Sequence, residues 1–211
     1  MRKIIKGPEP ASLTQHRQTA HADYDNYRDK ETLRIFLVDE QRGVCCYCLG
    51  RIRPEIASMK IAHCRSQYNH PDEQLSYANL LGACKGNEGQ KPGAQHCDTK
   101  QGDADLSRNP ADPARDIEGV IRFEGDGIIA ASDPAFDKEL NDVLNLNLKF
   151  LQNNRKAVLD AFKQTLDRKG EIGRLTLEKW LRDWNGESHN GELQPYCQVV
   201  VFWLRKRLAR A

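Results

Sequence analysis

The N-terminal half of the chain alternates between short apolar segments and polar or glycine-rich ones. The first dozen residues predict an extended arm. Residues 29–42 carry apolar side chains at helical spacing and precede a glycine, which predicts a helix that ends there. Residues 59–63 alternate in polarity and predict a short strand. Residues 76–83 fit either a helix or a second short segment, and the glycine-rich residues 85–95 predict a loop.

Helical periodicity dominates the C-terminal half. Residues 120–131 predict a β-hairpin that turns at a Gly-Asp-Gly sequence. Apolar residues then recur at helical spacing over residues 148–170, 175–184 and 193–208, which predicts three helices. No internal repeat interrupts this order.

After residue 113 the chain changes from a cysteine-rich segment to one with mainly helical periodicity, which predicts two domains in an α+β protein. Residues 1–115 would form an N-terminal arm and helix together with a cysteine-rich module. Residues 116–211 would form a β-hairpin and a mainly helical domain.

Composition and charge exclude several classes of protein. The chain has 211 residues, of which 39% are hydrophobic and 29% charged, as is typical of a globular protein. No apolar run approaches the roughly 20 residues of a membrane span, and the start lacks the pattern of a secretory signal. We therefore expect a cytoplasmic protein without a membrane partner. With 32 basic and 30 acidic residues, bulk charge gives no argument for nucleic-acid binding, which would need a local patch.

The cysteines predict a metal site. Six of the seven lie between positions 45 and 97, which in a reducing compartment favours metal binding over disulfides. Cys45 and Cys48 have the C-x-x-C spacing that lets two thiolates from one turn bind one tetrahedral ion. Cys84 and Cys97 are the best candidates for the second pair. Four thiolates predict a structural Zn²⁺ rather than an ion that prefers oxygen ligands.

Other interpretations of the cysteines stay open at this point. Cys46 could replace one member of the set, His96 could replace Cys97, and the cysteines could instead be buried and inert. A redox C-x-x-C motif would start a helix after a strand, whereas residues 45–48 follow a predicted helix, so this interpretation is disfavoured. Two cysteines are interpreted as ordinary small hydrophobic residues: Cys64 and Cys197.

Polar residues occupy particular positions between and after the cysteine pairs. His63 ends the predicted strand, Asn79 precedes an apolar run, and Asp98 follows Cys97. The order C-x-x-C, His, Asn-Leu, Cys, Cys-Asp-x-Lys-x-Gly resembles the zinc-stabilised HNH endonucleases of the ββα-metal fold, over about residues 43–103. More of the chain is similar to the PtuB-like HNH proteins of retron and Septu-type phage-defence systems. The segments that carry this similarity are Met1–Lys6, Glu40–Cys48, Met59–His63, Asn79–Gly86, His96–Thr99, Asn109–Pro113 and Val143–Asn147.

The resemblance implies a metal-dependent endonuclease that hydrolyses nucleic-acid phosphodiester bonds. By position, His63 matches the general base, Asn79 the residue that orients it, and Asp98 the third, metal-binding position. The cysteines match the structural zinc ligands: Cys45, Cys48, Cys84 and Cys97. A histidine with an ordinary pKa near ~6.5 suits proton transfer at neutral pH, and a divalent ion would act as a Lewis acid.

One position departs from the family's pattern. Many HNH enzymes place an acidic residue or a second histidine directly before the base, as a ligand for catalytic Mg²⁺ or Mn²⁺, and here that residue is Ala62. Asp103, about one helical turn beyond Asp98, is the candidate for the missing ligand, with His96 and water as the other options. Basic residues near the site are expected to contact phosphates: Lys85, Lys91, Lys100 and Arg108.

The resemblance also implies partners. It suggests a bacterial defence effector that acts with a PtuA-like ATPase and with a retron reverse transcriptase and its RNA–DNA hybrid. Whether the substrate is DNA or RNA stays open. Two other classes remain: a zinc-scaffolded nucleic-acid-binding or adaptor protein with a degenerate nuclease site, favoured by Ala62, and a redox dithiol protein.

Overall fold

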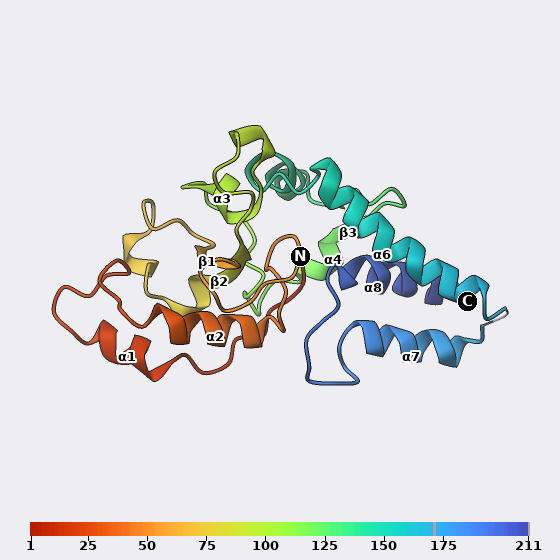
Figure 1. The fold of residues 1–211 in the computed structure, drawn as a ribbon, viewed down its shortest axis with the longest axis horizontal. Helices are drawn as coiled ribbons and strands as arrows, with labels where there is room; N and C mark the ends of the chain where they lie inside the picture. The colour runs from red at the N-terminus through yellow and green to blue at the C-terminus, as the bar shows by residue number, and fades with distance from the viewer. Residues whose placement is uncertain (171, 211) are drawn as a thin grey trace.

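The computed structural model describes residues 1–170 and 172–210, so that residues 171 and 211 of the second predicted domain lie outside the described residues. The fold is mixed α+β, as expected, with two separate two-stranded antiparallel sheets among the described residues. The molecule is elongated: the first two helices and the first sheet lie at one end, and three long helices gather at the other (Figure 1). No helix in the described part is long and apolar enough to cross a membrane.

The elements follow one another in an order that interleaves short helices with the two sheets. They are α1 (Ala11–Arg17), α2 (Lys30–Glu40), β1 (Met59–His63), η1 (Pro71–Glu73), η2 (Tyr77–Asn79), β2 (Leu80–Cys84), η3 (Pro92–Ala94), α3 (Cys97–Gln101), α4 (Ile117–Val120), β3 (Ile121–Phe123), β4 (Ile129–Ala131), α5 (Pro134–Lys138), η4 (Glu139–Val143), α6 (Lys149–Asp167), α7 (Arg174–Trp184) and α8 (Cys197–Leu208).

The first sheet is a hairpin of β1 and β2 with His63 opposite Leu80 and Met59 opposite Cys84. The predicted strand at 59–63 is confirmed. The segment that the sequence left undecided forms one 3₁₀ turn, η2, and then β2. Helix α2, also confirmed, lies against this hairpin. The side-chain amide of Gln41, at the end of α2, donates to the carbonyl of Gly82 at 2.7 Å and accepts from its N–H at 2.6 Å, which fixes α2 on β2.

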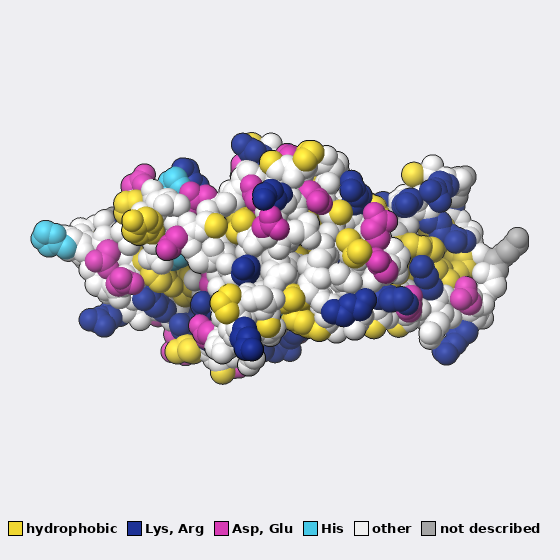
Figure 2. Space-filling view, turned by 90° about the horizontal axis from the view of Figure 1, so that it is seen from above, with side chains coloured by type: hydrophobic (Ala, Val, Ile, Leu, Met, Phe, Trp, Pro, Cys, Tyr) yellow, Lys and Arg dark blue, Asp and Glu magenta, His cyan; other side chains and the backbone are white. Residues whose placement is uncertain are grey.

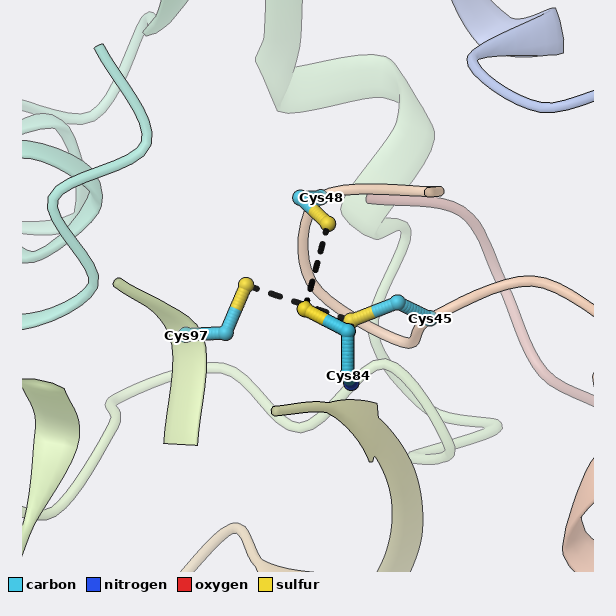
Figure 3. A group of neighbouring side chains, drawn as sticks. All are labelled: Cys45, Cys48, Cys84 and Cys97. Atoms are coloured by element: carbon cyan, nitrogen blue, oxygen red, sulfur yellow. Dashed lines mark hydrogen bonds between the residues drawn. The ribbon is translucent and has the colours of Figure 1, made fainter. Parts of the chain in front are cut away.

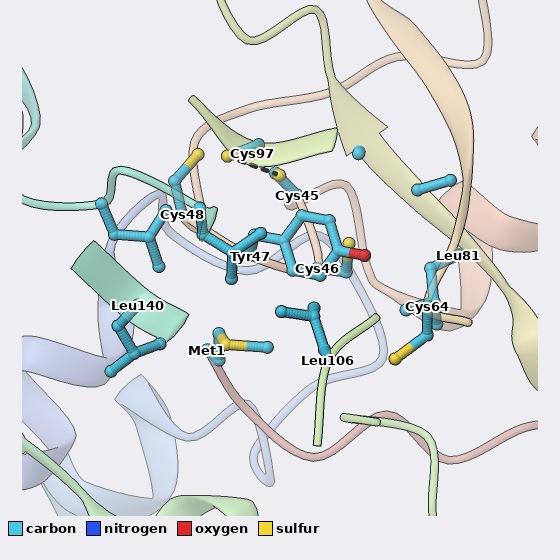
Figure 4. Packing of buried hydrophobic residues seen from close by; sticks show 14 of the residues in the cluster. Met1, Cys45, Cys46, Tyr47, Cys48, Cys64, Leu81, Cys97, Leu106 and Leu140 are labelled. Carbon is cyan, nitrogen blue, oxygen red and sulfur yellow. Dashed lines mark hydrogen bonds between the residues drawn. The ribbon is translucent and has the colours of Figure 1, made fainter. Parts of the chain in front are cut away.

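The largest core cluster joins both halves of the chain. It contains the cysteine turn, the β1–β2 hairpin, and residues from Leu106 to Leu151, and the fully buried ring of Tyr47 lies within it (Figure 4). Met1 and Ile4 are buried in the same cluster, and the Ile4 N–H donates to the Pro110 carbonyl at 2.9 Å. The predicted arm has neither helix nor strand over residues 1–10, and at Met1 and Ile4 it packs into the core. The boundary near residue 115 stays a prediction, and the core continues across it.

The C-terminal helices were largely predictable. Helices α6 and α7 match the predicted spans, and the hairpin of β3 and β4 is confirmed. Helix α8 begins only at Cys197, four residues later than predicted at 193, because Pro195 precedes it and Tyr196 adopts a left-handed conformation with φ of 59°. The ring of Phe162 packs edge-on against three tryptophans at centroid distances of 5.6–5.8 Å: Trp180, Trp184 and Trp203.

Gly127, in the turn of the second hairpin, packs against the backbone of α6 and is expected to tolerate no side chain. Its φ is +88°, and a Cβ would lie 2.1 Å from the carbonyl oxygen of Gln152. The buried Arg155 guanidinium also donates to the Gly127 carbonyl at 2.6 Å. We expect Gly127→Ala to lower the free energy of unfolding by about 1–3 kcal/mol or more. Urea denaturation of zinc-loaded protein measures this.

The control for this prediction is two residues away. A Cβ on Gly125 would meet no atom within 4 Å, and its φ lies outside the left-handed range. The Gly125→Ala variant should therefore have the same midpoint of urea unfolding as the wild type. Equal midpoints for the two variants would contradict the role given to Gly127.

Candidate functional site

Four cysteine sulfurs converge where the turn at residues 45–48, the end of β2 and the start of α3 meet (Figure 3). The Sγ atoms of Cys45, Cys48, Cys84 and Cys97 all lie within 4.8 Å of one another. The Sγ atoms of Cys45 and Cys97 are 3.9 Å apart, and those of Cys48 and Cys84 are 3.7 Å apart. A zinc ion with Zn–S bonds of about 2.3 Å in a tetrahedron places its sulfurs about 3.8 Å apart. The donor set and its spacing therefore fit one structural Zn²⁺.

The backbone around this cluster is folded to support thiolates. The Gly50 N–H donates to the sulfur of Cys48 at 3.3 Å, and the Cys84 N–H donates to the sulfur of Cys45 at 3.3 Å. Donors aimed at sulfur stabilise the deprotonated form that zinc requires.

The geometry selects among the alternatives that the sequence left open. Cys97, rather than His96, belongs to the group, and the His96 ring nitrogen Nδ1 lies 3.1 Å from the sulfur of Cys97. Cys46 is buried outside the group. A set of four convergent sulfurs favours metal binding over a two-cysteine redox centre. Two further cysteines are buried outside the cluster, as expected: Cys64 and Cys197.

His63 lies at the end of β1 with its ring largely enclosed. Its exposed fraction is 7%, and Nε2 donates to the backbone carbonyl of Gln74 at 3.0 Å. A proton on Nε2 leaves Nδ1 as the acceptor nitrogen of the neutral ring. Burial lowers the pKa of His63 below its ordinary value, and the carbonyl of Gln74 partly opposes that change. The neutral imidazole that a general base needs is therefore the favoured form at pH 7.

Asn79 holds the two backbone segments that surround His63. Its Oδ1 accepts from the Arg65 N–H at 2.8 Å, and its Nδ2 donates to the carbonyls of Arg65 at 2.9 Å and Glu73 at 3.3 Å. Arg65 follows His63 by two residues, and Glu73 precedes the Gln74 whose carbonyl accepts from the His63 ring. Asn79 therefore fixes these two segments relative to each other, and its role in orienting a base stays a prediction.

Replacing Asn79 should loosen the hairpin end and the His63 ring together. Asn79→Ala removes three hydrogen bonds at a side chain that is 3% exposed, so we expect the free energy of unfolding to fall by about 1–3 kcal/mol. The Nε2–H resonance of His63 should also broaden in the NMR spectrum, because its acceptor becomes mobile. Asn153→Ala, on the exposed side of α6, is the control, and it should change neither quantity.

Asp98 lies in the first turn of α3 and contacts a lysine from β1. Its Oδ2 is 3.3 Å from the Nζ of Lys60, and Lys60 also donates to the Thr99 hydroxyl at 3.3 Å. Burial raises the pKa of Asp98, and the Lys60 ammonium opposes that rise. Lys60 is not among the residues expected at the site from the sequence, although its position two residues before Ala62 in an alternating strand places both on one face.

The residues predicted for a catalytic divalent ion are not gathered into a set of ligands. Among the described residues, the four-cysteine cluster is the one group of three or more His, Cys, Asp or Glu side chains close enough to share an ion. Asp103 is exposed beyond the end of α3, and its backbone carbonyl accepts from Asn69 at 3.0 Å. Ala62 is fully buried. Asp98, with an ammonium group beside it, does not fit a divalent ion in this arrangement.

Tyr24 packs against the His63 ring, and nothing in the local sequence indicates this contact. Its ring lies edge-on to the His63 imidazole with centroids 4.6 Å apart, and the Nζ of Lys30 lies 4.3 Å from the Tyr24 centroid. Burial raises the pKa of Tyr24, Arg34 opposes the rise, and the negative charge of Asp98 adds to it. Tyr24 belongs to the loop between α1 and α2, so only the tertiary fold brings it to the hairpin.

Two of the basic residues predicted to contact nucleic acid are engaged within the protein. Lys85 pairs with Glu88, and Arg108 pairs with Asp133 at 2.8 Å. Lys100 lies half-buried in α3. On the face shown in Figure 2, basic and acidic side chains are interspersed over most of the surface, and basic side chains surround an apolar area towards the end formed by the C-terminal helices.

A spacious groove lies away from these residues. It encloses about 650 Å³ between α6, α7 and the segment before α8, and its lining includes Phe162, Trp180 and Trp184. Neither His63 nor a cysteine of the cluster lines it. The groove therefore gives no information on the chemistry of the hairpin.

Comparison with known proteins does not assign a family. No protein-family model matches the chain, and no curated protein sequence matches it. The structure establishes a mixed α+β protein whose buried four-cysteine cluster could bind zinc.

Proposed function

We propose that the chain is an endonuclease of the HNH type, built on a zinc-stabilised ββα-metal module, that hydrolyses nucleic-acid phosphodiester bonds. The observation that carries the proposal is the order β1, β2, α3 around the cysteine cluster. His63 ends β1 with its ring fixed by Gln74, Asn79 orients that segment, and Asp98 lies in the first turn of α3. This is the order of elements and residues that the HNH resemblance implies.

The chemistry follows from the orientation of His63. Nδ1 accepts a proton from a water molecule, and the resulting hydroxide forms a bond to phosphorus. The bond from phosphorus to the leaving sugar oxygen breaks, and that oxygen takes a proton from solvent. A positioned general base contributes about 10²–10⁴-fold to the rate. The Mg²⁺ or Mn²⁺ that the resemblance implies stays a separate prediction, because the described neighbours of Asp98 include an ammonium group.

The biological setting of the proposal rests on the resemblance to PtuB-like proteins. It comprises a bacterial antiphage system with a PtuA-like ATPase and, in the retron form, a reverse transcriptase with its RNA–DNA hybrid. The mixed surface charge in Figure 2 is compatible with a nuclease that depends on a partner to hold its substrate.

A second candidate is a zinc-scaffolded nucleic-acid-binding or adaptor protein with a degenerate nuclease site. The pairing of Asp98 with Lys60 and the alanine at position 62 favour it, because the first engages one expected metal ligand and the second offers none. The two candidates differ in whether the purified chain cleaves nucleic acid.

Cleavage assays distinguish them. The full chain, alone and with proteins encoded by neighbouring genes, is incubated with single- and double-stranded DNA and RNA. The proposal expects cleavage that depends on His63. Binding without cleavage under all these conditions would favour the adaptor.

A further inference from the structure

We propose that the ammonium group of Lys60 is the resident cation of the hairpin site. It would occupy the place beside Asp98 where the resemblance puts a divalent ion, so that the site works without one. The inference builds on the proposed function, because it concerns the positive charge that this site presents to a phosphate.

The strand geometry places Lys60 correctly for this role. Lys60 and Ala62 are two residues apart in β1, so their side chains lie on the same face of the strand. That face is turned toward α3, because Lys60 contacts Asp98 and Thr99 there. Lys60 therefore reaches the space beside Asp98 from the face on which HNH enzymes carry their additional acidic ligand.

Oxygen atoms from three residues surround the Lys60 ammonium. Nζ lies 3.3 Å from Oδ2 of Asp98, 3.5 Å from Oε1 of Glu88 and 3.3 Å from Oγ1 of Thr99. A lysine ammonium has three N–H donors and no acceptor, so these three acceptors match its hydrogen-bonding capacity. Carboxylate and hydroxyl oxygens are also ligands that Mg²⁺ and Mn²⁺ prefer. These oxygens could bind a hard cation, and in this structure the Lys60 ammonium occupies the position between them.

The ammonium is both tethered and accessible. A divalent ion could take the same oxygens only by displacing a positive charge that is covalently part of β1. The Lys60 side chain is 30% exposed and that of Asp98 18%. The pair is therefore partly open to solvent, and a phosphate oxygen that binds Nζ would replace one of its three present acceptors.

Metal binding tests the inference without any enzyme assay. Zinc-loaded full-length protein is titrated with Mn²⁺, and the free ion is followed by electron paramagnetic resonance. We expect no Mn²⁺ site in the wild type. Lys60→Met removes the ammonium at nearly constant length and should create one site, so that at the same free Mn²⁺ concentration the variant binds roughly tenfold or more Mn²⁺ than the wild type. Lys60→Met combined with Asp98→Asn should lose it again.

A matched variant excludes a trivial gain of affinity from any unpaired carboxylate. Lys138 pairs with Asp142 at 2.9 Å on an exposed surface, so Lys138→Met also frees a carboxylate. This variant should gain no Mn²⁺ site. A wild-type protein whose Mn²⁺ binding is abolished by Asp98→Asn would overturn the inference, as would a folded Lys60→Met protein that binds no Mn²⁺.

Cleavage in buffer freed of divalent ions by a chelating resin, with zinc content verified, separates this inference from the proposed function. Wild-type cleavage that stays within about twofold when Mg²⁺ is added supports the inference. Cleavage that appears only with Mg²⁺ and is lost in Asp98→Asn overturns the inference and leaves the nuclease proposal intact. If no nucleic acid is cleaved, the nuclease proposal fails, and the Mn²⁺ titration still decides the identity of the cation.

Discussion

Replacing Cys48 by serine is expected to unfold the protein rather than merely to release its zinc. Three of the four candidate ligands, Cys45, Cys48 and Cys97, are also members of the largest core cluster. Structural zinc sites contribute about 10–16 kcal/mol of apparent binding free energy, which is comparable to the whole stability of a domain, about 5–15 kcal/mol. Elemental analysis should find one zinc per wild-type chain and none in Cys48→Ser, and circular dichroism should report the loss of folded structure.

The matched control is another buried cysteine. Cys64 is fully buried but lies outside the cluster, so Cys64→Ser should keep one zinc and remain folded. Removal of zinc from the wild type by a chelator under mild denaturation should reproduce the Cys48→Ser spectrum. Well-folded wild-type protein that contains no zinc would contradict the assignment.

The elements that the sequence predicted are those with a local signal. Helices α2, α6 and α7 show apolar residues at helical spacing, and the hairpin of β3 and β4 turns at Gly127. The Cys45–Cys48 pair was predictable for the same reason, because both ligands come from one turn. A short-range pattern is enough for such features because their geometry depends on adjacent residues.

The remaining features depend on contacts between distant segments. Strand β2 was undecided because its partner β1 lies some twenty residues earlier, and five residues carry no distinct periodicity. Met1 and Ile4 fall in the predicted arm because their packing in the core, and the hydrogen bond from the Ile4 N–H to the Pro110 carbonyl, leave no trace in the local sequence. The choice between Cys97 and His96 and the pairing of Lys60 with Asp98 likewise needed the folded chain.

The largest catalytic effect is expected at His63. His63→Ala should lower the rate of nucleic-acid cleavage by about 10²–10⁴-fold, because it removes the acceptor nitrogen that takes the proton from water. The alanine variant also loses the hydrogen bond to the Gln74 carbonyl at a position that is 7% exposed, so a second variant is needed to separate chemistry from folding.

His63→Gln is that variant. The glutamine side chain can donate from Nε2 to the Gln74 carbonyl, as the imidazole does, but it offers no basic nitrogen. We expect it to fold and bind nucleic acid as the wild type does, and to be as inactive as His63→Ala. His189→Gln, at an exposed histidine remote from the hairpin in the sequence, should keep full activity.

The pH dependence of cleavage gives the same assignment an independent test. Burial lowers the pKa of His63, so protonation, which removes the base, should occur only below its ordinary value of 6.5. The cleavage rate should therefore not change with the protonation of His63 above pH 6.5, and it should fall as the pH drops through the lowered pKa.

The Asn79→Ala variant keeps the imidazole but frees the segment that orients it. It should cleave more slowly than the wild type, and its rate should still fall at acidic pH as the wild-type rate does. A His63→Gln protein that is folded and cleaves at the wild-type rate would show that another group activates the water, and the base would then have to be sought elsewhere along the hairpin.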